Sequence, residues 1–218
     1  MKDYVQVGVI GLGKFGLEFG SIISGYGVNV LGIDNNPELV KRAKSVLTQV
    51  MQADATSKEA LIQMGVGQLS HVLVSVGDSL AASAMITLYL KELGVPIVWA
   101  KAINTDHATL LRKLGVDEVI IPEHMAARQM AAKITIPGFL DFFPFSKEVV
   151  LKEIVIDQWT GKSLKDLDLS NRYRIQAIAA KHKGDVEFSI LPKADKPLRQ
   201  GDTLVIIGEI DRLEDIAP

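Results

Sequence analysis

The sequence lacks cysteine, has no long apolar run and carries no excess of basic charge. The missing cysteine excludes disulfides, cysteine-ligated zinc and thiol catalysis, and it fits a reducing compartment. The best candidate for a membrane span, Ser79–Leu90, is bounded by charged residues and falls far short of the roughly 20 residues that a spanning helix needs. The net charge is −2 and the basic residues are scattered, so nucleic-acid binding is disfavoured. We therefore expect a soluble protein whose membrane role, if it has one, comes through a partner.

Apolar strand-like runs and amphipathic stretches alternate along the first 122 residues. This alternation predicts right-handed β–α–β units and a parallel sheet covered on both faces, an α/β fold of the Rossmann type. Met1–Tyr4 lead straight into the first strand pattern, so no signal peptide is expected. The expected strands are Val5–Ile10, Val28–Ile33, Val46–Gln52, His71–Val76, Ile97–Ala102 and Glu118–Ile121. The expected helices cover Phe15–Ser24, a segment from Pro37, Ser57–Met64, Ser79–Leu93 and Thr105–Leu114.

The pattern changes after Pro122. Residues 123–134 have apolar positions at helical spacing, and Pro137-Gly138 then precedes a segment rich in phenylalanine that ends at Phe145. Two interpretations stay open for this segment: a linker packed on its own domain, or an arm that crosses to a partner subunit, because concentrated aromatics often mark an interface. We expect a Rossmann-like domain at 1–122, a crossing helix and arm at 123–147, and a small C-terminal lobe at 148–218.

The C-terminal lobe is expected to be mostly antiparallel, an α+β unit of about 70 residues. It is too small for the usual substrate domain of a dehydrogenase. A half-buried strand is predicted first, then a short helix, then a hairpin around Lys183-Gly184-Asp185 and a final strand. These elements are expected at Val149–Ile156, Ser163–Leu169, Ile175–His182, Val186–Leu191 and Thr203–Ile207.

A glycine-rich loop, Gly11-Leu12-Gly13-Lys14-Phe15-Gly16, follows the first strand and opens a helix. Its three glycines suit a tight turn, close approach of a phosphate and close helix–strand packing, in that order. The helix N-terminus then offers N–H groups and a partial positive charge to the phosphates. Asp34 ends the second strand, where a carboxylate can bind ribose hydroxyls and repel the 2′-phosphate of NADP. Lys14 could reach a β- or γ-phosphate or could be a solvated lysine at the helix start.

Further polar residues follow the later strands, at the carboxyl edge of the sheet where ligands bind in such folds. Asp54-Ala55 ends the third strand; Asp54 could bind the adenine amino group or cap the next helix. Ser75-Val76-Gly77-Asp78 ends the fourth strand. Lys101 ends the fifth, either as a phosphate contact or as a surface lysine.

Glu123 opens a helix just after Pro122. It complements the helix dipole in that position, and beside a triphosphate it could also hold a divalent cation. The four histidines show neither metal-ligand spacing nor a catalytic partner, so each is expected to be structural or on the surface. They are His71, His107, His124 and His182.

Taken together, the motifs closely resemble those of the RCK (also called KTN) domain, whose nearest relatives are cytosolic gating subunits of the bacterial Trk and Ktr potassium-uptake systems. The first half carries the resemblance at Val9–Gly16, Gly32–Asp34, Ala53–Thr56, Val74–Asp78, Trp99–Ala102 and Ile121–Glu123. The C-terminal lobe resembles the companion domain at Gly161–Leu164, Leu167–Leu169, Ile178–Gly184 and Gly201–Val205.

This resemblance implies that Gly11, Gly13, Gly16, Asp34 and Asp54-Ala55 hold the nucleoside and its phosphates. Lys14 stands where relatives often have an arginine that reads the terminal phosphate of ATP; lysine keeps the charge but loses bidentate geometry. Asn35 and Asn36 are implied as ribose contacts. Glu123 matches a carboxylate that lies near the phosphates at a subunit interface with a divalent ion, Mg²⁺ or Ca²⁺.

The resemblance also implies a function. ATP or ADP is the first expectation as ligand, with NAD(H) or AMP as alternatives. The helix and arm at 123–145 would build an intertwined dimer, and four dimers an octameric ring under a Trk or Ktr pore subunit at the inner face of the membrane. Ligand binding would then change the ring and gate potassium flow. A cyclic dinucleotide is implied in some relatives at the C-terminal lobe, here near Leu169–Ile175 and Pro192.

Two other functions remain open from the sequence. The first is an NAD-dependent oxidoreductase, for which His124 or Lys101 would be the only acid–base candidates. The second is a free-standing nucleotide or redox sensor with another client. Neither accounts for the two-lobe resemblance, so a non-enzymatic regulatory subunit is the expected function.

Overall fold

The computed structural model describes residues 6–76, 79–143, 146, 148–214, 216 and 218. The chain divides into two compact units, Met1–Pro122 and Glu123–Pro218, and each is described by itself. No helix in these ranges is both long and apolar enough to cross a bilayer.

The first unit contains a six-stranded parallel sheet in the order β3-β2-β1-β4-β5-β6. This order reverses direction beside the central strand β1, which pairs in parallel with both β2 and β4. The Rossmann-type sheet predicted from the sequence is therefore confirmed. Its strands are β1 Gln6–Ile10, β2 Asn29–Asp34, β3 Gln49–Gln52, β4 His71–Val74, β5 Ile97–Lys101 and β6 Glu118–Ile120.

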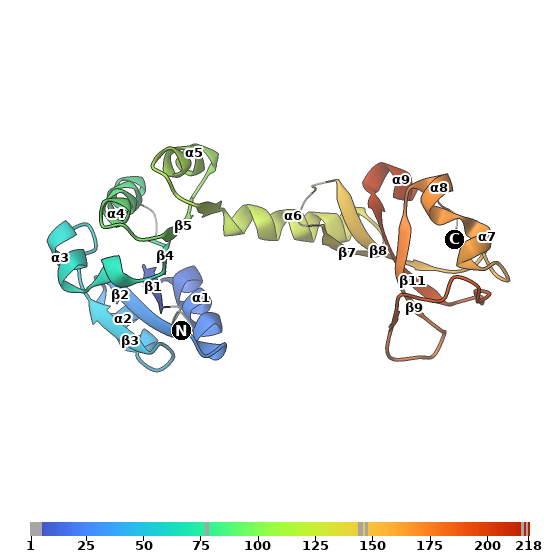
Figure 1. Ribbon diagram of the computed structural model, residues 1–218, viewed down its shortest axis with the longest axis horizontal. Coiled ribbons are helices and arrows are strands. Elements are labelled where there is room, and N and C mark those ends of the chain that lie inside the picture. Colours follow the sequence, from blue (N-terminus) through green and yellow to red (C-terminus); the bar gives the residue numbers. More distant parts are fainter. Residues whose placement is uncertain (1–5, 77–78, 144–145, 147, 215, 217) are drawn as a thin grey trace. The chain divides into compact units, whose positions relative to one another are not determined.

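Helices cover both faces of this sheet, α1 and α2 on one side and α4 and α5 on the other (Figure 1). Successive residues of a strand point to opposite faces of the sheet, and each face has its own hydrophobic core. Val7 and Val9 pack with Phe15 and Phe19, whereas Ile10 packs with Val72 and Ile86. Side chains cap most helices, because Asn36, Ser57, Ser79 and Asn104 each accept a first-turn backbone N–H. The helices are α1 Lys14–Gly25, α2 Pro37–Ala43, α3 Lys58–Gln63, the 3₁₀ turn η1 Val66–Gln68, α4 Leu80–Glu92 and α5 Thr105–Lys113.

The second unit is built on a five-stranded antiparallel sheet in the order β10-β9-β11-β8-β7. Its core includes Val150, Ile154, Trp159, Leu204 and Ile206. The small α+β lobe predicted from the sequence is thus present. Its elements are α6 Pro122–Thr135, β7 Phe139–Phe142, β8 Val149–Val155, α7 Leu164–Leu167, α8 Leu169–Tyr173, β9 Gln176–Lys181, β10 Ser189–Ile190, β11 Thr203–Glu209 and α9 Ile210–Glu214.

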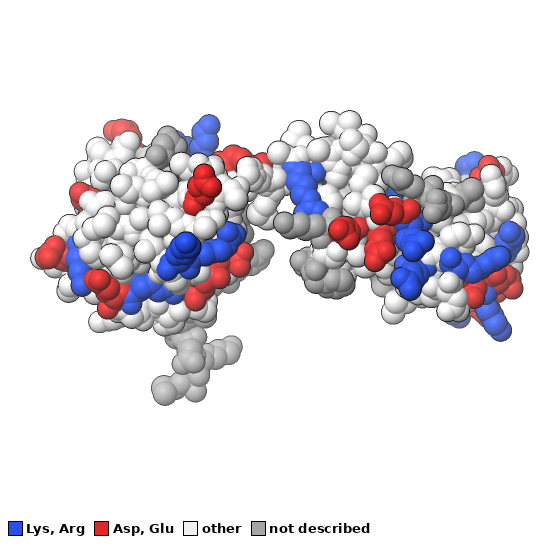
Figure 2. All heavy atoms as spheres, turned by 90° about the horizontal axis from the view of Figure 1, so that it is seen from above, with Lys and Arg blue, Asp and Glu red and all other residues white. Residues whose placement is uncertain are grey.

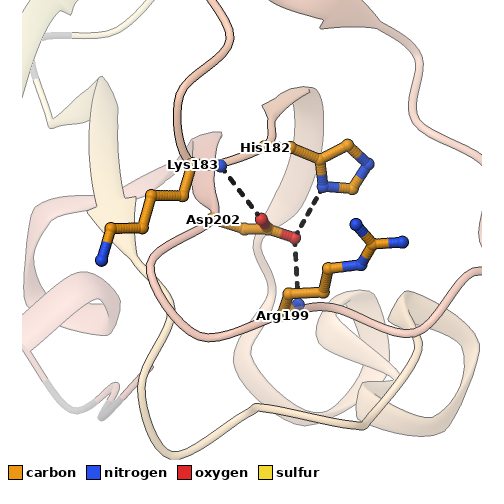
Figure 3. A network of polar contacts seen from close by, with 4 residues as sticks. All are labelled: His182, Lys183, Arg199 and Asp202. Atoms are coloured by element: carbon orange, nitrogen blue, oxygen red, sulfur yellow. Dashed lines mark hydrogen bonds and ion pairs between the residues drawn. The ribbon is translucent and has the colours of Figure 1, made fainter.

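A buried carboxylate joins three segments of this lobe (Figure 3). Asp202 is only 3% exposed and accepts hydrogen bonds from the backbone N–H groups of Arg199 (3.0 Å) and Lys183 (3.3 Å). His182 Nδ1 lies 3.0 Å from its Oδ2. Burial alone would raise the pKa of Asp202, but the hydrogen bonds from Arg199 and His182 outweigh burial and hold that pKa below its ordinary value. The ionised carboxylate therefore fixes the ends of β9 and β11 together.

The segment expected at 123–147 lies in the second unit. Phe139 and Phe142 lie in β7, an edge strand that pairs with β8 through Phe139↔Lys152 and Phe142↔Val150. Phe139 is buried, and the guanidinium of Arg128 on α6 lies 3.7 Å from the ring centre of Phe142. The described part of the segment thus packs on its own domain; Phe145 lies outside the described residues.

Three predicted elements differ in the structure. The helix expected at Ser163–Leu169 is broken by Asp168, whose φ of +47° separates α7 from α8. The second hairpin strand, expected at Val186–Leu191, is reduced to β10. The third strand begins at Gln49 rather than Val46, because the N–H groups of Val46 and Leu47 still bond to the carbonyl of Ala43 at the end of α2.

Candidate functional site

A cleft of about 730 Å³ lies at the carboxyl ends of the parallel strands in the first unit. This volume is in the range of small-molecule sites, and the cleft sits at the point where the strand order reverses. Its lining includes Gly11, Gly13, Lys14, Phe15, Asp34, Asn35, Asn36, Asp54, Ala55, Thr56, Ser75, Val76, Ser79 and Lys101, together with Ile10, Ile33, Leu39, Ala53, Ala82 and Ile86.

The three glycines of the loop do different things. Gly11 has a φ of +94°, and a side chain there would collide with the backbone of Ser75 at the end of β4. A side chain at Gly16 would collide with the carbonyl of Gly11, so this glycine lets α1 pack against the loop. A Cβ added at Gly13, by contrast, would have open space around it, with no atom of the described residues within 4 Å. Gly13 therefore leaves the cleft clear, whereas Gly11 and Gly16 permit the turn itself.

Helix α1 points its N-terminus at this cleft. Its N-cap is Gly13, which supplies no side-chain hydrogen bond, and the first turn contains no acidic residue. The first N–H groups and the positive end of the helix dipole are therefore not neutralised by the helix itself. Such a helix start favours an anion. Lys14, at its first position, is exposed and adds a positive charge to that of the helix end.

Asp34 is tied to the glycine loop. Its Oδ2 accepts the backbone N–H of Leu12 (2.7 Å), and its Oδ1 accepts that of Asn36 (2.8 Å). An ionised carboxylate has about four lone-pair sites, so both oxygens keep capacity for a ligand hydroxyl. The sequence predicted Asp34 as a ribose partner but did not indicate that it also holds the loop.

Asp54 is exposed, and its side chain accepts hydrogen bonds from Thr56, two residues along the chain. Its Oδ1 accepts the hydroxyl (2.7 Å) and the backbone N–H (2.9 Å) of Thr56. These two bonds lower the pKa of Asp54, so the side chain is ionised at neutral pH. The N-cap of α3 is Ser57, so the alternative that Asp54 caps this helix was wrong.

Charges are segregated along the lip of the cleft. Asp34 and Asp54 follow β2 and β3, whereas Lys14 and Lys101 follow β1 and β5. One end thus offers acceptors for hydroxyl and amino groups, and the other offers cations beside a helix N-terminus. An adenosine carrying phosphates has this polarity.

Most of the residues predicted from the sequence meet at this cleft. Gly16 does not line it and acts through packing, and Gly77 lies outside the described residues. Sequence reasoning missed Ser79, whose hydroxyl caps α4 and which lines the cleft; its signal was a serine just before a helix. It also missed Leu39 and Ile86, which have the same apolar spacing as core residues.

Glu123 opens α6 and does not line the cleft. Across the described ranges, no group of three or more His, Asp or Glu side chains could hold a metal ion. None of the four histidines lines the cleft either. His107 is buried, His71 bonds to Ser70, and His182 belongs to the Asp202 network.

A smaller pocket of about 250 Å³ lies in the second unit, between α7, α8 and the start of β9. All the non-glycine residues with positive φ in the described chain occur around it: Asp168, Arg174 and Leu191. Asp168 lines the pocket, and the other two adjoin segments that do. Such backbone conformations carry strain and cluster at ligand sites. The lining is Leu164, Lys165, Asp168, Leu169, Ser170, Gln176, Ala177, Pro192 and Ala194.

Comparison with known proteins covers both units. Residues 7–122 match the TrkA-N domain, and residues 152–218 match the TrkA-C domain. The chain is 34% identical over 206 residues to the Ktr system potassium uptake protein C of Bacillus subtilis, covering 94% of this chain and 92% of that protein. It is 34% identical over 213 residues to protein A of the same organism's Ktr system, covering 96% and 95%.

A solved structure, the GsuK channel bound to NAD, has the same fold. The TM-score is 0.54 at 18% identity, and the match covers 97% of this chain and 38% of that one. The resemblance seen in the sequence motifs is confirmed by these matches, which extend over both halves. The chain belongs to the family of proteins with TrkA-N and TrkA-C domains that includes the Ktr potassium uptake proteins.

Proposed function

We propose that the chain is a nucleotide-sensing regulatory subunit of a potassium uptake system. The observation that carries this proposal is the combination of a cleft large enough for a nucleotide with 34% identity to Ktr proteins along nearly their whole length. It acts at the cytoplasmic face of the membrane, held there by a pore subunit of the Trk or Ktr type, and is not an enzyme.

The ligand of the cleft is an adenine nucleotide. Asp34, Asn35 and Asn36 take the ribose, and Asp54 takes the adenine amino group. The loop N–H groups, Lys14 and Lys101 take the phosphates. Two lysines and an uncapped helix end at one side favour ADP or ATP over AMP, and they favour a polyphosphate over the nicotinamide half of NAD(H).

A divalent cation, Mg²⁺ or Ca²⁺, accompanies the phosphates, with Glu123 as a ligand. Glu123 is not among the residues that line the cleft, and the proposal places its carboxylate at the phosphates across a subunit interface. Phosphate oxygens and one carboxylate are the hard ligands that these ions prefer.

The working form is an intertwined dimer and, from four dimers, an octameric ring. Two exposed apolar surfaces support self-assembly. On α6, Met125, Met130 and Ile134 are 64%, 66% and 83% exposed. On α4, the outer side carries Met85 and Leu88 among alanines, and they are 41% and 38% exposed. Exposed apolar surface of this kind is typical of protein–protein interfaces.

Gating follows from differential binding. A nucleotide can shift the ring between two states only by the ratio of its affinities for them, and a change from 1:99 to 99:1 needs about 10⁴-fold preference. ATP and ADP differ in the charge they place beside Lys14, so they can favour different states.

The second-unit pocket takes part of a cyclic dinucleotide. Ligand sites usually enclose about 300–1,000 Å³, so a pocket of about 250 Å³ is half a site, completed by the same pocket of a second lobe. The strained residues Asp168, Arg174 and Leu191 around it support a ligand role.

Calorimetric titration with ATP, ADP, NAD and NADH, with and without Mg²⁺ or Ca²⁺, tests the ligand. Light scattering with each nucleotide, alone and with a Trk or Ktr pore subunit, tests the assembly. A chain that stays monomeric with every nucleotide and ignores the pore subunit would contradict the proposal. Substrate-dependent change in NADH absorbance with hydroxy acids or alcohols would instead revive an oxidoreductase, although the described lining of the cleft contains no histidine.

A further inference from the structure

Besides the hydroxyl oxygen of Ser24 on α1, three buried polar atoms in the first unit have no hydrogen-bond partner among the described residues. They are the hydroxyl oxygens of Ser83 and Thr87 and the Nε2 atom of His107. The exposed fractions of these residues are 0%, 0% and 1%. Buried polar groups in native proteins are nearly always hydrogen-bonded, and one left unpaired costs about 1–3 kcal/mol. Three in one core require an explanation.

The three residues belong to two neighbouring helices. Ser83 and Thr87 lie one turn apart on α4, and His107 lies in the first turn of α5, which packs beside α4. Ala82 and Ile86, on the same helix, line the cleft. A helix turns by 100° per residue, so Ser83 and Thr87 occupy a different flank from the cleft-lining residues. Lys91, one turn beyond Thr87 on the same helix, bonds to Asp117 in the segment between α5 and β6, which places this flank towards α5. We call the space between them the α4–α5 seam.

The hydroxyls of the seam do not use the usual intrahelical partner. Thr109 on α5 and Thr135 on α6 each donate to the carbonyl four residues back, at 3.0 Å in both cases. Thr87 has no such bond although it lies in the middle of a helix. Its hydroxyl, and that of Ser83, therefore keep both donor and acceptor capacity for a partner outside the helix.

His107 presents a donor. Its Nδ1 accepts the backbone N–H of Ile103 at 3.3 Å, which leaves the proton of a neutral ring on Nε2. Burial lowers the pKa of His107 and so favours this neutral form. The Nε2–H group needs an acceptor, but it forms no direct hydrogen bond with Ser83 or Thr87.

We propose that the α4–α5 seam binds at least one ordered water, which accepts from His107 Nε2–H and bridges to the hydroxyls of Ser83 and Thr87. Three polar partners are the number that a buried water typically has. The water links α4, which lines the cleft, to the loop that begins directly after Lys101. This inference does not depend on which nucleotide binds or on any pore partner.

The substitution Thr87→Val distinguishes an α4–α5 seam that contains water from one that does not, because valine has the shape of threonine without the hydroxyl group. In a hydrated seam the water loses a partner, and the unfolding temperature of the first unit falls by about 4 °C. In a dry seam the variant removes an unpaired polar group, and the unfolding temperature rises. Thr109→Val, at an exposed position on α5, is the matched control and is expected to change the temperature by less.

Unfolding is followed by the fluorescence of Trp99 in a Trp159→Phe background, without nucleotide, so that only the first unit reports. A crystal structure of the wild type must also show a water peak at about 2.7–3.2 Å from His107 Nε2. An unchanged or raised unfolding temperature, or no water peak, overturns the proposal. If Thr87→Val does not fold, Ser83→Ala and the crystal structure decide.

Discussion

Replacing Gly13 with alanine is expected to weaken nucleotide binding while leaving the fold intact. Gly13 has φ −64° and ψ −170°, a conformation open to any L-residue, and open space surrounds the position of its absent side chain. The added methyl group therefore meets no protein atom of the described residues. Restricting the unfolded chain should even stabilise the variant by about 0.4–1 kcal/mol.

The loss of affinity can be worked from the loop. The methyl group would stand where phosphate oxygens approach the N–H groups of the α1 N-terminus at about 2.9 Å. Hydrogen bonds to charged groups contribute about 1.5–3 kcal/mol each. Losing one of them weakens binding by about 1.5–3 kcal/mol, which is roughly 10- to 150-fold in Kd. Calorimetric titration with ATP and ADP measures this change.

Gly16→Ala is the matched comparison within the same loop. Its side chain would collide with the carbonyl of Gly11, so the loop must shift and the unfolding temperature should fall together with affinity. A Gly13→Ala chain that binds ATP and ADP as tightly as the wild type would refute the placement of the phosphates on this loop. A Gly13→Ala chain that unfolds would refute the geometry of the loop itself.

Four further outcomes are expected. Asp34→Ala should abolish calorimetric binding of ATP, ADP, NAD and NADH, whereas exposed Asp106→Ala, away from the cleft, should bind normally; micromolar binding in the Asp34 variant would contradict the site. Asp202→Ala should destabilise the second unit by about 2–3 kcal/mol, because two N–H groups lose their acceptor; urea unfolding followed by Trp159 fluorescence in a Trp99→Phe background measures this, with Asp195→Ala as an exposed control expected within ~0.5 kcal/mol. The folded-state pKa of Asp202 lies below its ordinary value of 3.8, so the stability that the carboxylate contributes is present above that pH and is lost as the pH falls through the folded-state pKa. The difference in free energy of unfolding between the wild type and Asp202→Ala should therefore narrow in acid. A difference that widens in acid would contradict the lowered pKa. Arg174→Gly should stabilise the second unit by about 1 kcal/mol, because φ is +56° there, while Arg174→Val should destabilise it by the same assay.

The candidate site was predictable wherever topology alone decides. Parallel strands alternating with helices bring every strand end to one edge, so Asp34, Asp54 and Lys101 could be placed together without knowing any distance. The two hydrogen bonds that Asp34 accepts from the backbone N–H groups of Leu12 and Asn36 could not be predicted, because they depend on how the loop folds back over β2. Leu39 and Ile86 were missed because an apolar side chain has the same spacing whether it faces a ligand or the core.

The second unit was harder to predict. Asp168 and Arg174 adopt the left-handed conformation without being glycine, so nothing in the residue types marks the break between α7 and α8. Strand β7 follows Pro137-Gly138 and is short, and its aromatic residues fit a linker equally well. Antiparallel pairing with β8, the next strand along the chain, makes this segment a strand in the folded chain.

Helix α4 has consequences for mutational tolerance. Figure 2 looks down on the side of the first unit where α4 lies in Figure 1, and that surface is mostly uncharged, with Lys, Arg, Asp and Glu gathered around it. Most surface helices have one flank on which polar substitutions are harmless. On α4 one flank lines the cleft, the next faces α5, and the outer one carries Met85 and Leu88. A saturation screen should therefore find that a charged residue is accepted at few positions between Leu80 and Leu90, and at more of the exposed positions on α2 and α5.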